Sequence, residues 1–438
     1  MVFRPIAMNN PESKAPEALS GIERAVFNKI AWRLMPLLTV GYVLNYMDRN
    51  NIGFAALTMN KAIALTATQF GLGAGILFFG YCAFEIPSNI ALYRFGARIW
   101  ISRIMITWGF VSAATIFVSG PRSWYLLRFL LGTAEAGFFP GVAYYIATWF
   151  PAEYRARMLA WFVLAIPASS VISGPVSGLL LNMDGIAGLA GWKWLFILEG
   201  LPVVLLGAVM FWLLSDGPEQ AKWLTEEERR FVRERISGEH RHREVRQLLP
   251  ALKDVRVLIL AVVQFGFLVG SYGVGIWLPQ IIKTAHFSNL GVGFIFSGCY
   301  VLACIGMIAW SSHVDRRGGT IFHLALTCLI SAAGLLLAIV SGGFWASLAW
   351  VTVALIGITS ARSIFWAIPT RFLTGMAAAG GIAFINSIGT IGGFVGPAVM
   401  GWLKDRTGLF NAGLMAMAGI LLVASAMAWS LKLFVQHD

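Results

Sequence analysis

The run YVLNYMDRNNIGFAAL, residues 42–57, places two charged side chains inside a segment that is otherwise apolar enough to cross a membrane. Asp48 and Arg49 lie about halfway along the apolar segment 33–58. A charge at the centre of a bilayer is costly, so such residues normally face a water-filled cavity or each other. The stretch therefore indicates a membrane helix with a functional polar face.

The rest of the chain repeats the apolar pattern of this segment. Of its 438 residues, 58% are hydrophobic and only 12% are charged, which is not the composition of a soluble globular protein. An apolar run of about 20 residues is long enough to span a bilayer. The sequence predicts an all-α membrane protein with twelve transmembrane helices in two six-helix bundles. The expected spans are 33–58, 69–92, 99–119, 122–148, 157–182, 192–214, 256–282, 290–311, 320–341, 344–370, 376–402 and 409–434.

The net charge of +12 is distributed as in a membrane protein and not as in a nucleic-acid-binding protein. Most Lys and Arg residues fall in alternate loops, and this asymmetry predicts that both chain termini are cytoplasmic. The long polar segment is nearly balanced in charge, and TEEERRFVRERI (225–236) within it has a helix-capping pattern. The expected parts are a cytoplasmic tail (1–32), a first bundle (33–214), a cytoplasmic linker (215–255), a second bundle (256–434) and a cytoplasmic C-terminal tail (435–438).

The two predicted bundles show a weak internal repeat. Arg94 in YRFGAR (93–98) and Arg316 in DRRGG (315–319) are 222 residues apart. Gly174 in GPVSG and Gly396 in GPAVMG are separated by the same 222 residues. Repeated halves with a site between them are a common plan of secondary transporters.

Several motifs resemble the major facilitator superfamily and, within it, the anion:cation symporter family. They are NYMDRNNIGFA (45–55), RFLLGTAEAGFFPG (128–141), WFPAEYRARM (149–158), WLFILEG (194–200) and FINSIGTIGGFVGP (384–397). EIPSNIALYRFGARIW (85–100) and SARSIFWAIPTRF (360–372) are similar to the branch of tartrate- and phthalate-type permeases. The resemblance covers essentially the whole chain. It implies gating loops that contain Arg94, Arg98, Asp315 and Arg316, although Tyr93 stands where the superfamily usually has Asp.

Charged residues on two spans of the first half lie on common helix faces. Asn45, Asp48 and Arg49 are at positions i, i+3 and i+4 of span 33–58, whereas Arg128 and Glu135 are two turns apart on span 122–148. The resemblance implies that these two spans line the central cavity. We therefore expect the two faces to meet there.

The residue types on these faces suit a proton-coupled anion carrier. Arginine keeps its charge in proteins and can hold an anionic substrate, so Arg49 and Arg128 are predicted substrate ligands. A desolvated carboxylate favours its protonated form, so Asp48 and Glu135 are predicted to take up the coupling proton. The alternative interpretation is a static lattice of buried ion pairs that holds the helices together.

Other acids in the chain are less suited to proton coupling. Glu85 and Glu199 lie in predicted spans, and for both a structural role is favoured. After residue 254 the acids are Asp315, Asp405 and Asp438, all outside the expected spans. Proton handling is therefore predicted to reside in the first half.

The second half offers a buried cation and polar groups. Arg362 lies in span 344–370 with Trp366 one turn later, and it is predicted to bind a second part of the anion. A structural, snorkelling Arg362 is the alternative. Asn386 can act as both donor and acceptor toward a hydroxylated substrate or can join helices. The resemblance further implies that Tyr46, Tyr81, Trp366 and Asn386 line the site.

Together these features predict a secondary transporter and not an enzyme. We expect proton-coupled uptake of a small carboxylate, such as tartrate, another dicarboxylate, a sugar acid or an aromatic acid, across a bacterial inner membrane. Sodium coupling and, less favoured, a drug exporter that works by proton antiport remain alternatives. The expected partners are the organic anion, the coupling ion and the lipid bilayer. No cofactor, metal site or nucleic acid is expected, and the protein is expected to act as a monomer.

Overall fold

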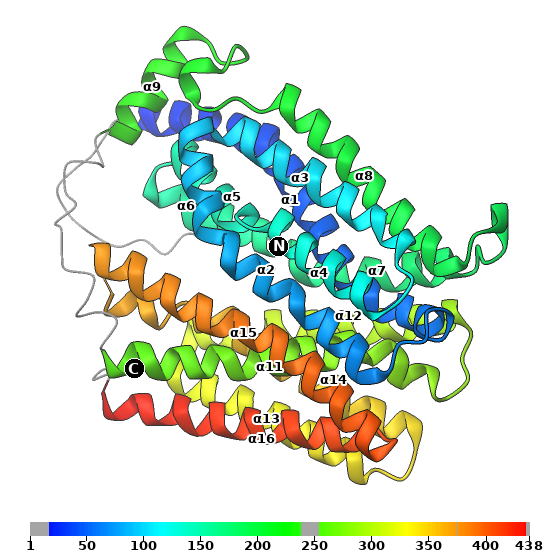
Figure 1. Ribbon diagram of the computed structural model, residues 1–438. Helices are drawn as coiled ribbons and strands as arrows, with labels where there is room; N and C mark the ends of the chain where they lie inside the picture. Colours follow the sequence, from blue (N-terminus) through cyan, green and yellow to red (C-terminus); the bar gives the residue numbers. More distant parts are fainter. Residues whose placement is uncertain (1–16, 238–253, 374, 435–438) are drawn as a thin grey trace.

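The structure, a computed structural model, describes residues 17–237, 254–373 and 375–434. These residues form helices joined by short loops, with no β-strand among them, which confirms the expected all-α fold (Figure 1). The first half contains α1 (Glu17–Ala62), α2 (Ala67–Phe95), α3 (Ala97–Ala113), α4 (Pro121–Glu135), α5 (Phe138–Trp149), α6 (Ala152–Val163), α7 (Ala165–Leu181) and α8 (Gly191–Leu213). The linker contains α9 (Glu226–Ser237). The second half contains α11 (Val255–Lys283), α12 (Asn289–Arg317), α13 (Thr320–Val340), α14 (Phe344–Phe365), α15 (Gly375–Thr407) and α16 (Asn411–Ser430).

The helices account for the twelve expected membrane spans. Within the described residues, 11 segments are long and apolar enough to cross a membrane, and they coincide with the second to twelfth expected spans. Two of these spans are each formed by a helix pair, α4 with α5 and α6 with α7. The first span lies in α1, which is less apolar than the other spans because it carries polar residues at 45–51.

Helix α1 begins within the segment predicted as a tail, and this extension packs beside α9. Lys29 Nζ lies 2.8 Å from Glu228 Oε2, and Arg235 Nε lies 3.2 Å from Glu23 Oε1. The capping box predicted for α9 is present, since Glu228 N donates to Thr225 Oγ1 and Thr225 N donates to the Glu228 carboxylate. Burial opposes ionisation of Glu228, but the hydrogen bonds from Lys29 and Thr225 hold its pKa below the usual range. The remaining predicted tail and linker residues, 1–16, 238–253 and 435–438, lie outside the described residues.

The two halves meet along two pairs of helices, α2 with α15 and α7 with α12 (Figure 1). A Cβ atom at Gly71 of α2 would overlap the carbonyl oxygen of Pro397 in α15. A Cβ atom at Gly293 of α12 would overlap the carbonyl oxygen of Gly174, which precedes Pro175 in α7. Gly71 and Gly293 are 222 residues apart, as are Pro175 and Pro397. The offset found in the sequence therefore relates two glycine contacts that join the halves.

These contacts close one end of the helix bundle. We call the other end, at which α2, α8 and α16 terminate and where α9 lies, the linker end; it is the predicted cytoplasmic end. At the closed end Asp405 of α15 accepts hydrogen bonds from the backbone N–H groups of Ala67, at 3.0 Å, and Thr68, at 2.7 Å. These amides open α2, where the helix dipole favours a carboxylate. The bond ties the second half to the first at the closed end.

We expect Gly174→Ala to destabilise this closed arrangement. The new methyl group would overlap the backbone of Gly293 and the Ser297 hydroxyl, and overpacking of this kind costs about 1–3 kcal/mol. The melting temperature of the purified protein in detergent should therefore fall. The matched control is Gly298→Ala in α12, the helix that packs against α7 at Gly174. Nothing lies within 4 Å of the methyl group that this change adds. Equal melting temperatures for the two variants would contradict close packing at Gly174.

Candidate functional site

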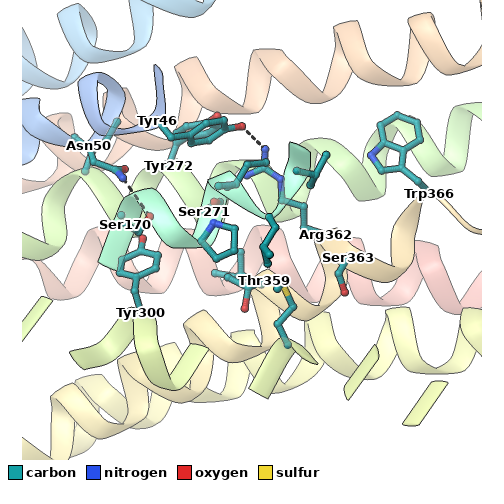
Figure 2. A pocket seen from close by; sticks show the side chains of 18 of the residues that line it. Tyr46, Asn50, Ser170, Ser271, Tyr272, Tyr300, Thr359, Arg362, Ser363 and Trp366 are labelled. Carbon is teal, nitrogen blue, oxygen red and sulfur yellow. Dashed lines mark hydrogen bonds between the residues drawn. The ribbon is translucent and has the colours of Figure 1, made fainter. Parts of the chain in front are cut away.

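A cavity of about 310 Å³ lies between the two halves and extends toward the linker end. Helices α1, α6, α7, α11, α12 and α14 contribute its wall, so both halves form it. The lining mixes aromatic, hydroxyl and apolar side chains with one guanidinium (Figure 2). Its residues are Tyr46, Asn50, Ala160, Val163, Leu164, Ile166, Pro167, Ser170, Ser271, Tyr272, Gly275, Ile276, Tyr300, Met307, Ile358, Thr359, Arg362, Ser363 and Trp366.

Arg362 is the positive charge in this wall. Its Nη2 atom donates a 2.6 Å hydrogen bond to the Tyr46 hydroxyl of the opposite half, drawn as a dashed line in Figure 2. No carboxylate among the described residues lies within ion-pair distance of Arg362. Helix α14 ends at Phe365, a few residues before Pro369, because a proline disfavours helix in the residue before it. Trp366, which the resemblance implies as a site residue, lies in the cavity wall directly after the helix end.

Arg49 and Glu135 form a buried ion pair between α1 and α4. The Nε and Nη2 atoms of Arg49 both donate to Glu135 Oε2, at 2.9 and 2.8 Å, and the Glu135 side chain is fully buried. The expected meeting of the first and fourth spans is therefore present. The guanidinium also lies 5.3 Å from the ring centroid of Tyr81 and 5.4 Å from that of Tyr46. Such rings favour a cation electrostatically in a dry environment.

Tyr272 connects the ion pair to the cavity. Arg49 Nη1 lies 3.4 Å from the Tyr272 hydroxyl, a long hydrogen bond, and Tyr272 itself lines the cavity. Arg49 is not among the lining residues, so in this conformation it stands behind the wall. Two of the three predicted arginine ligands therefore differ in their surroundings: Arg362 faces the cavity, whereas Arg49 is occupied by Glu135.

A break in the fourth span places Glu135 at a helix end. The sequence predicted one continuous helix over 122–148, but α4 ends at Glu135 and α5 begins at Phe138. Gly137 between them has φ 86°, a left-handed conformation that glycine adopts without strain. The Ser88 hydroxyl donates a 2.6 Å bond to the Ala136 carbonyl group, which has left the helical pattern. Irregular backbone at membrane depth is typical of transporter sites.

Asp48, Asn45 and Arg128 lie inside the first half and not at the cavity wall. All three are almost fully buried, with 1%, 2% and 2% of their surfaces exposed. The Asp48 carboxylate accepts hydrogen bonds from Ser112 and from Asn51. Arg128 lies 5.4 Å from the Trp124 ring centroid and interacts electrostatically with Asp48 and Glu135. The polar face of α1 is therefore divided between the protein core and the cavity.

The remaining predicted site residues occupy separate places. Asn386 Oδ1 lies 3.4 Å from Gln264 Nε2, and neither residue is in the cavity wall. Among the expected gating residues, the Arg98 backbone N–H donates a 2.8 Å bond to Asp216, after α8. Asp315 and Arg316 are exposed at the end of α12, and the exposed Arg94 packs on Phe95. Within the described residues, none of these four gating residues forms a hydrogen bond or ion pair between the halves.

Sequence reasoning missed several polar residues of the cavity wall, among them Asn50, Ser170, Tyr272 and Tyr300. Asn50 Nδ2 donates a 3.1 Å bond to Ser170 Oγ across the cavity wall, and Tyr272 and Tyr300 contribute hydroxyl groups (Figure 2). Asn50 lies one turn after Tyr46, a spacing that could have revealed it. Tyr272 stands in GSYGVG, a polar ring among glycines inside an apolar span.

Two bundles of membrane helices around a charged cavity define a membrane transport protein. The sequence pattern of the Major Facilitator Superfamily matches residues 38–397, and the chain belongs to this superfamily. An Agrobacterium vitis protein named "Putative tartrate transporter" is 48% identical over 92% of this chain and 90% of its own. A "Quinolone resistance transporter" of Acinetobacter baumannii is 42% identical over 91% of this chain and 93% of its own.

Solved structures agree with the fold. The crystal structure of a bacterial homologue of the human lysosomal transporter Spinster, in an inward-facing and occupied conformation, matches with a TM-score of 0.76. The match covers 92% of this chain and 97% of that chain at 16% identity, which establishes the common fold alone. The relatives are named as transporters, as the sequence predicted.

Proposed function

We propose that this protein imports a small organic anion, a carboxylate, together with protons. The observation that carries the proposal is Arg362, which lies in the wall of a cavity between the halves and has no carboxylate partner among the described residues. A guanidinium in a low-dielectric site without a carboxylate partner is stabilised by an arriving anion. The hydroxyl and amide groups around it suit a substrate with hydroxyl or further carboxyl groups.

The ion pair behind the wall supplies a route from protonation to anion binding. While Glu135 is ionised it holds Arg49, so the cavity presents Arg362 alone. When Glu135 takes a proton, the attraction to Arg49 is lost and this guanidinium can turn to a substrate carboxylate past Tyr272. A substrate with two anionic groups would then bind both arginines. Loss of the proton returns Arg49 to Glu135 and releases the anion.

The relative positions of the groups fit alternating access. The cavity extends toward the linker end, whereas glycine contacts and the Asp405 bonds close the other end. Rocking of the two halves would open the closed end and cover the cavity from the linker side. A bacterial inner-membrane location with cytoplasmic termini, and action as a monomer, belong to the same proposal and rest on the charge distribution of the loops.

Export of an aromatic acid is a second candidate. The cavity wall carries four aromatic side chains, Tyr46, Tyr272, Tyr300 and Trp366. The name of the Acinetobacter baumannii relative refers to quinolones, which combine a fused aromatic ring with a carboxylate. Arg362 would favour that carboxylate as it would favour tartrate, but the direction of transport would be reversed.

Transport into proteoliposomes tests the proposal and its rivals. Radiolabelled tartrate, phthalate and a sugar acid would be supplied with and without an inward proton gradient, beside a neutral sugar as control. We expect a carboxylate to accumulate only with the proton gradient. Accumulation driven by a sodium gradient at constant pH would show that sodium, and not the proton, is the coupling ion. If a quinolone were the one compound transported, and if it moved in the direction opposite to the protons, the result would support export and contradict uptake.

Tyr272→Phe should weaken the binding of a transported carboxylate about fivefold, the loss of about 1 kcal/mol expected for one hydrogen bond. The change removes the hydroxyl that contacts Arg49 and keeps the ring. Tyr300→Phe is the control, because it removes a hydroxyl from the same wall without a hydrogen bond to either arginine in the described structure. The half-saturating concentration for uptake is the measurement. Equal effects of the two changes would show that Tyr272 does not position Arg49.

A further inference from the structure

A second group of buried polar side chains lies in the first half, apart from the cavity. Asp48 and Asn51 come from α1 and Glu199 from α8, and all three are at most 4% exposed. Ser112 of α3 and Asn51 donate to Asp48 Oδ1, while Ser177 of α7 donates to Glu199 Oε1 at 2.8 Å. The Asn51 amide and the Asp48 carboxylate both interact with the Glu199 carboxyl group. Four helices thus converge on two carboxyl groups.

Each of the three central side chains keeps one oxygen without a donor. Asp48 Oδ2, Asn51 Oδ1 and Glu199 Oε2 are buried and have no hydrogen-bond partner among the described residues. A buried acceptor without a donor costs about 1–3 kcal/mol, more when it is charged. A positively charged ligand bound by these oxygens would satisfy them.

The charges of the first half point to the same ligand. Three carboxyl groups, Asp48, Glu135 and Glu199, face two guanidinium groups, Arg49 and Arg128, within the buried interior. Arg49 is held by Glu135, and Arg128 interacts with Asp48 and Glu135, so Glu199 has no cation of its own among the described residues. With all groups ionised the cluster carries one excess negative charge. A low-dielectric interior does not tolerate that charge, and one monovalent cation neutralises it.

The cluster is separate from the anion cavity although the two share α1. Asn50 lines the cavity and bonds Ser170, whereas the next residue, Asn51, is fully buried and bonds Asp48. Neither Asp48 nor Glu199 belongs to the cavity wall. A cation here would not touch the substrate.

We propose that Asp48, Asn51 and Glu199 form an enclosed site for one monovalent cation, a proton or a sodium ion shared between the two carboxyl groups. Glu199 is thereby a cation ligand, and Ser112 and Ser177 orient the carboxyl groups toward the shared ion. The consequence for transport rests on the proposed function: the cation would stay bound and neutralise the interior of the first half, while the proton at Glu135 drives the cycle. Binding itself does not depend on the substrate.

Purified protein without substrate tests the site by two measurements. Potentiometric titration between pH 5 and 9 counts bound protons, and a thermal-shift titration with sodium chloride against choline chloride detects sodium. If the shared ion is a proton, Glu199→Gln should bind one proton fewer per molecule than wild type. If it is sodium, wild type should be stabilised by sodium and the variant should not. Glu135→Gln is the control for the second measurement, because it should keep any sodium response.

Glu199→Asp serves as a second variant, since it keeps a carboxyl group at this position on a side chain that is one methylene shorter. It should restore the missing proton or part of the sodium response. A Glu199→Gln variant that equals wild type in both measurements would overturn the site and leave Glu199 a neutral structural acid. That outcome is distinct from failure of the proposed function, which would show as absent carboxylate uptake whatever the result of these titrations.

Discussion

Glu135→Gln should abolish accumulation of substrate while leaving its exchange across the membrane intact. Glutamine has the shape of the protonated acid but cannot release a proton. The ion pair with Arg49, in which two nitrogen atoms share Glu135 Oε2, is then permanently absent. The site should bind the anion in every cycle, yet the proton gradient can no longer drive the cycle in one direction.

The size of the effect follows from the coupling. One proton moved per anion under a gradient of one pH unit supplies about 1.4 kcal/mol, or roughly tenfold accumulation. In Glu135→Gln this ratio should fall to about one, while counterflow of labelled substrate persists. Accumulation driven by pH and counterflow would be measured on the same proteoliposomes.

Glu85→Gln is a useful control for this experiment. Glu85 is a half-buried acid on α2 that forms no hydrogen bond to Arg49 in the described structure. Its neutralisation should leave accumulation driven by pH in place. If Glu135→Gln still accumulated substrate, Glu135 would not be the coupling acid, and Asp48 would become the leading candidate.

The sequence was a good guide to the fold because membrane spans have a strong compositional signal. The apolar runs predicted the helices closely, including the first span, which is less apolar than the others because of the polar residues at 45–51. The meeting of Arg49 with Glu135 was also predictable, because charges at membrane depth need partners. The 222-residue offset pointed to the glycine contacts between the halves.

The direction in which each polar residue faces could not be predicted from the sequence. Asp48 and Arg49 are neighbours, but the former lies in the core of the first half and the latter pairs with Glu135. The break after Glu135 depends on Ser88 from another helix, which bonds the freed carbonyl group of Ala136. Tyr272 acquires its place beside Arg49 only when the second half packs on the first. Tertiary contacts decide these features, and no local pattern records them.

Arg362→Ala should reduce the affinity for a dicarboxylate by about ten- to hundredfold. Arg362 is the guanidinium of the cavity wall, and a charge-assisted hydrogen bond to a carboxylate contributes about 1.5–3 kcal/mol. The variant also leaves the Tyr46 hydroxyl without its donor, which adds to the loss. A short monocarboxylate that needs only Arg49 should lose less affinity. Arg362→Lys keeps the charge but not the planar fork, so its effect should be intermediate.

Arg371→Ala is the matched control for Arg362, because it removes a guanidinium nine residues later, at the end of the same span. Arg371 Nη2 donates a 2.6 Å bond to Thr320 Oγ1 and does not line the cavity. Binding of a dicarboxylate and a monocarboxylate to each purified variant would be compared by titration calorimetry. A selective loss of the dicarboxylate in Arg362→Ala, absent from Arg371→Ala, would assign the second substrate carboxylate to Arg362. Equal losses of both substrates would instead mean that Arg362 supports the shape of the cavity through Tyr46 and that the anion is held by Arg49 alone.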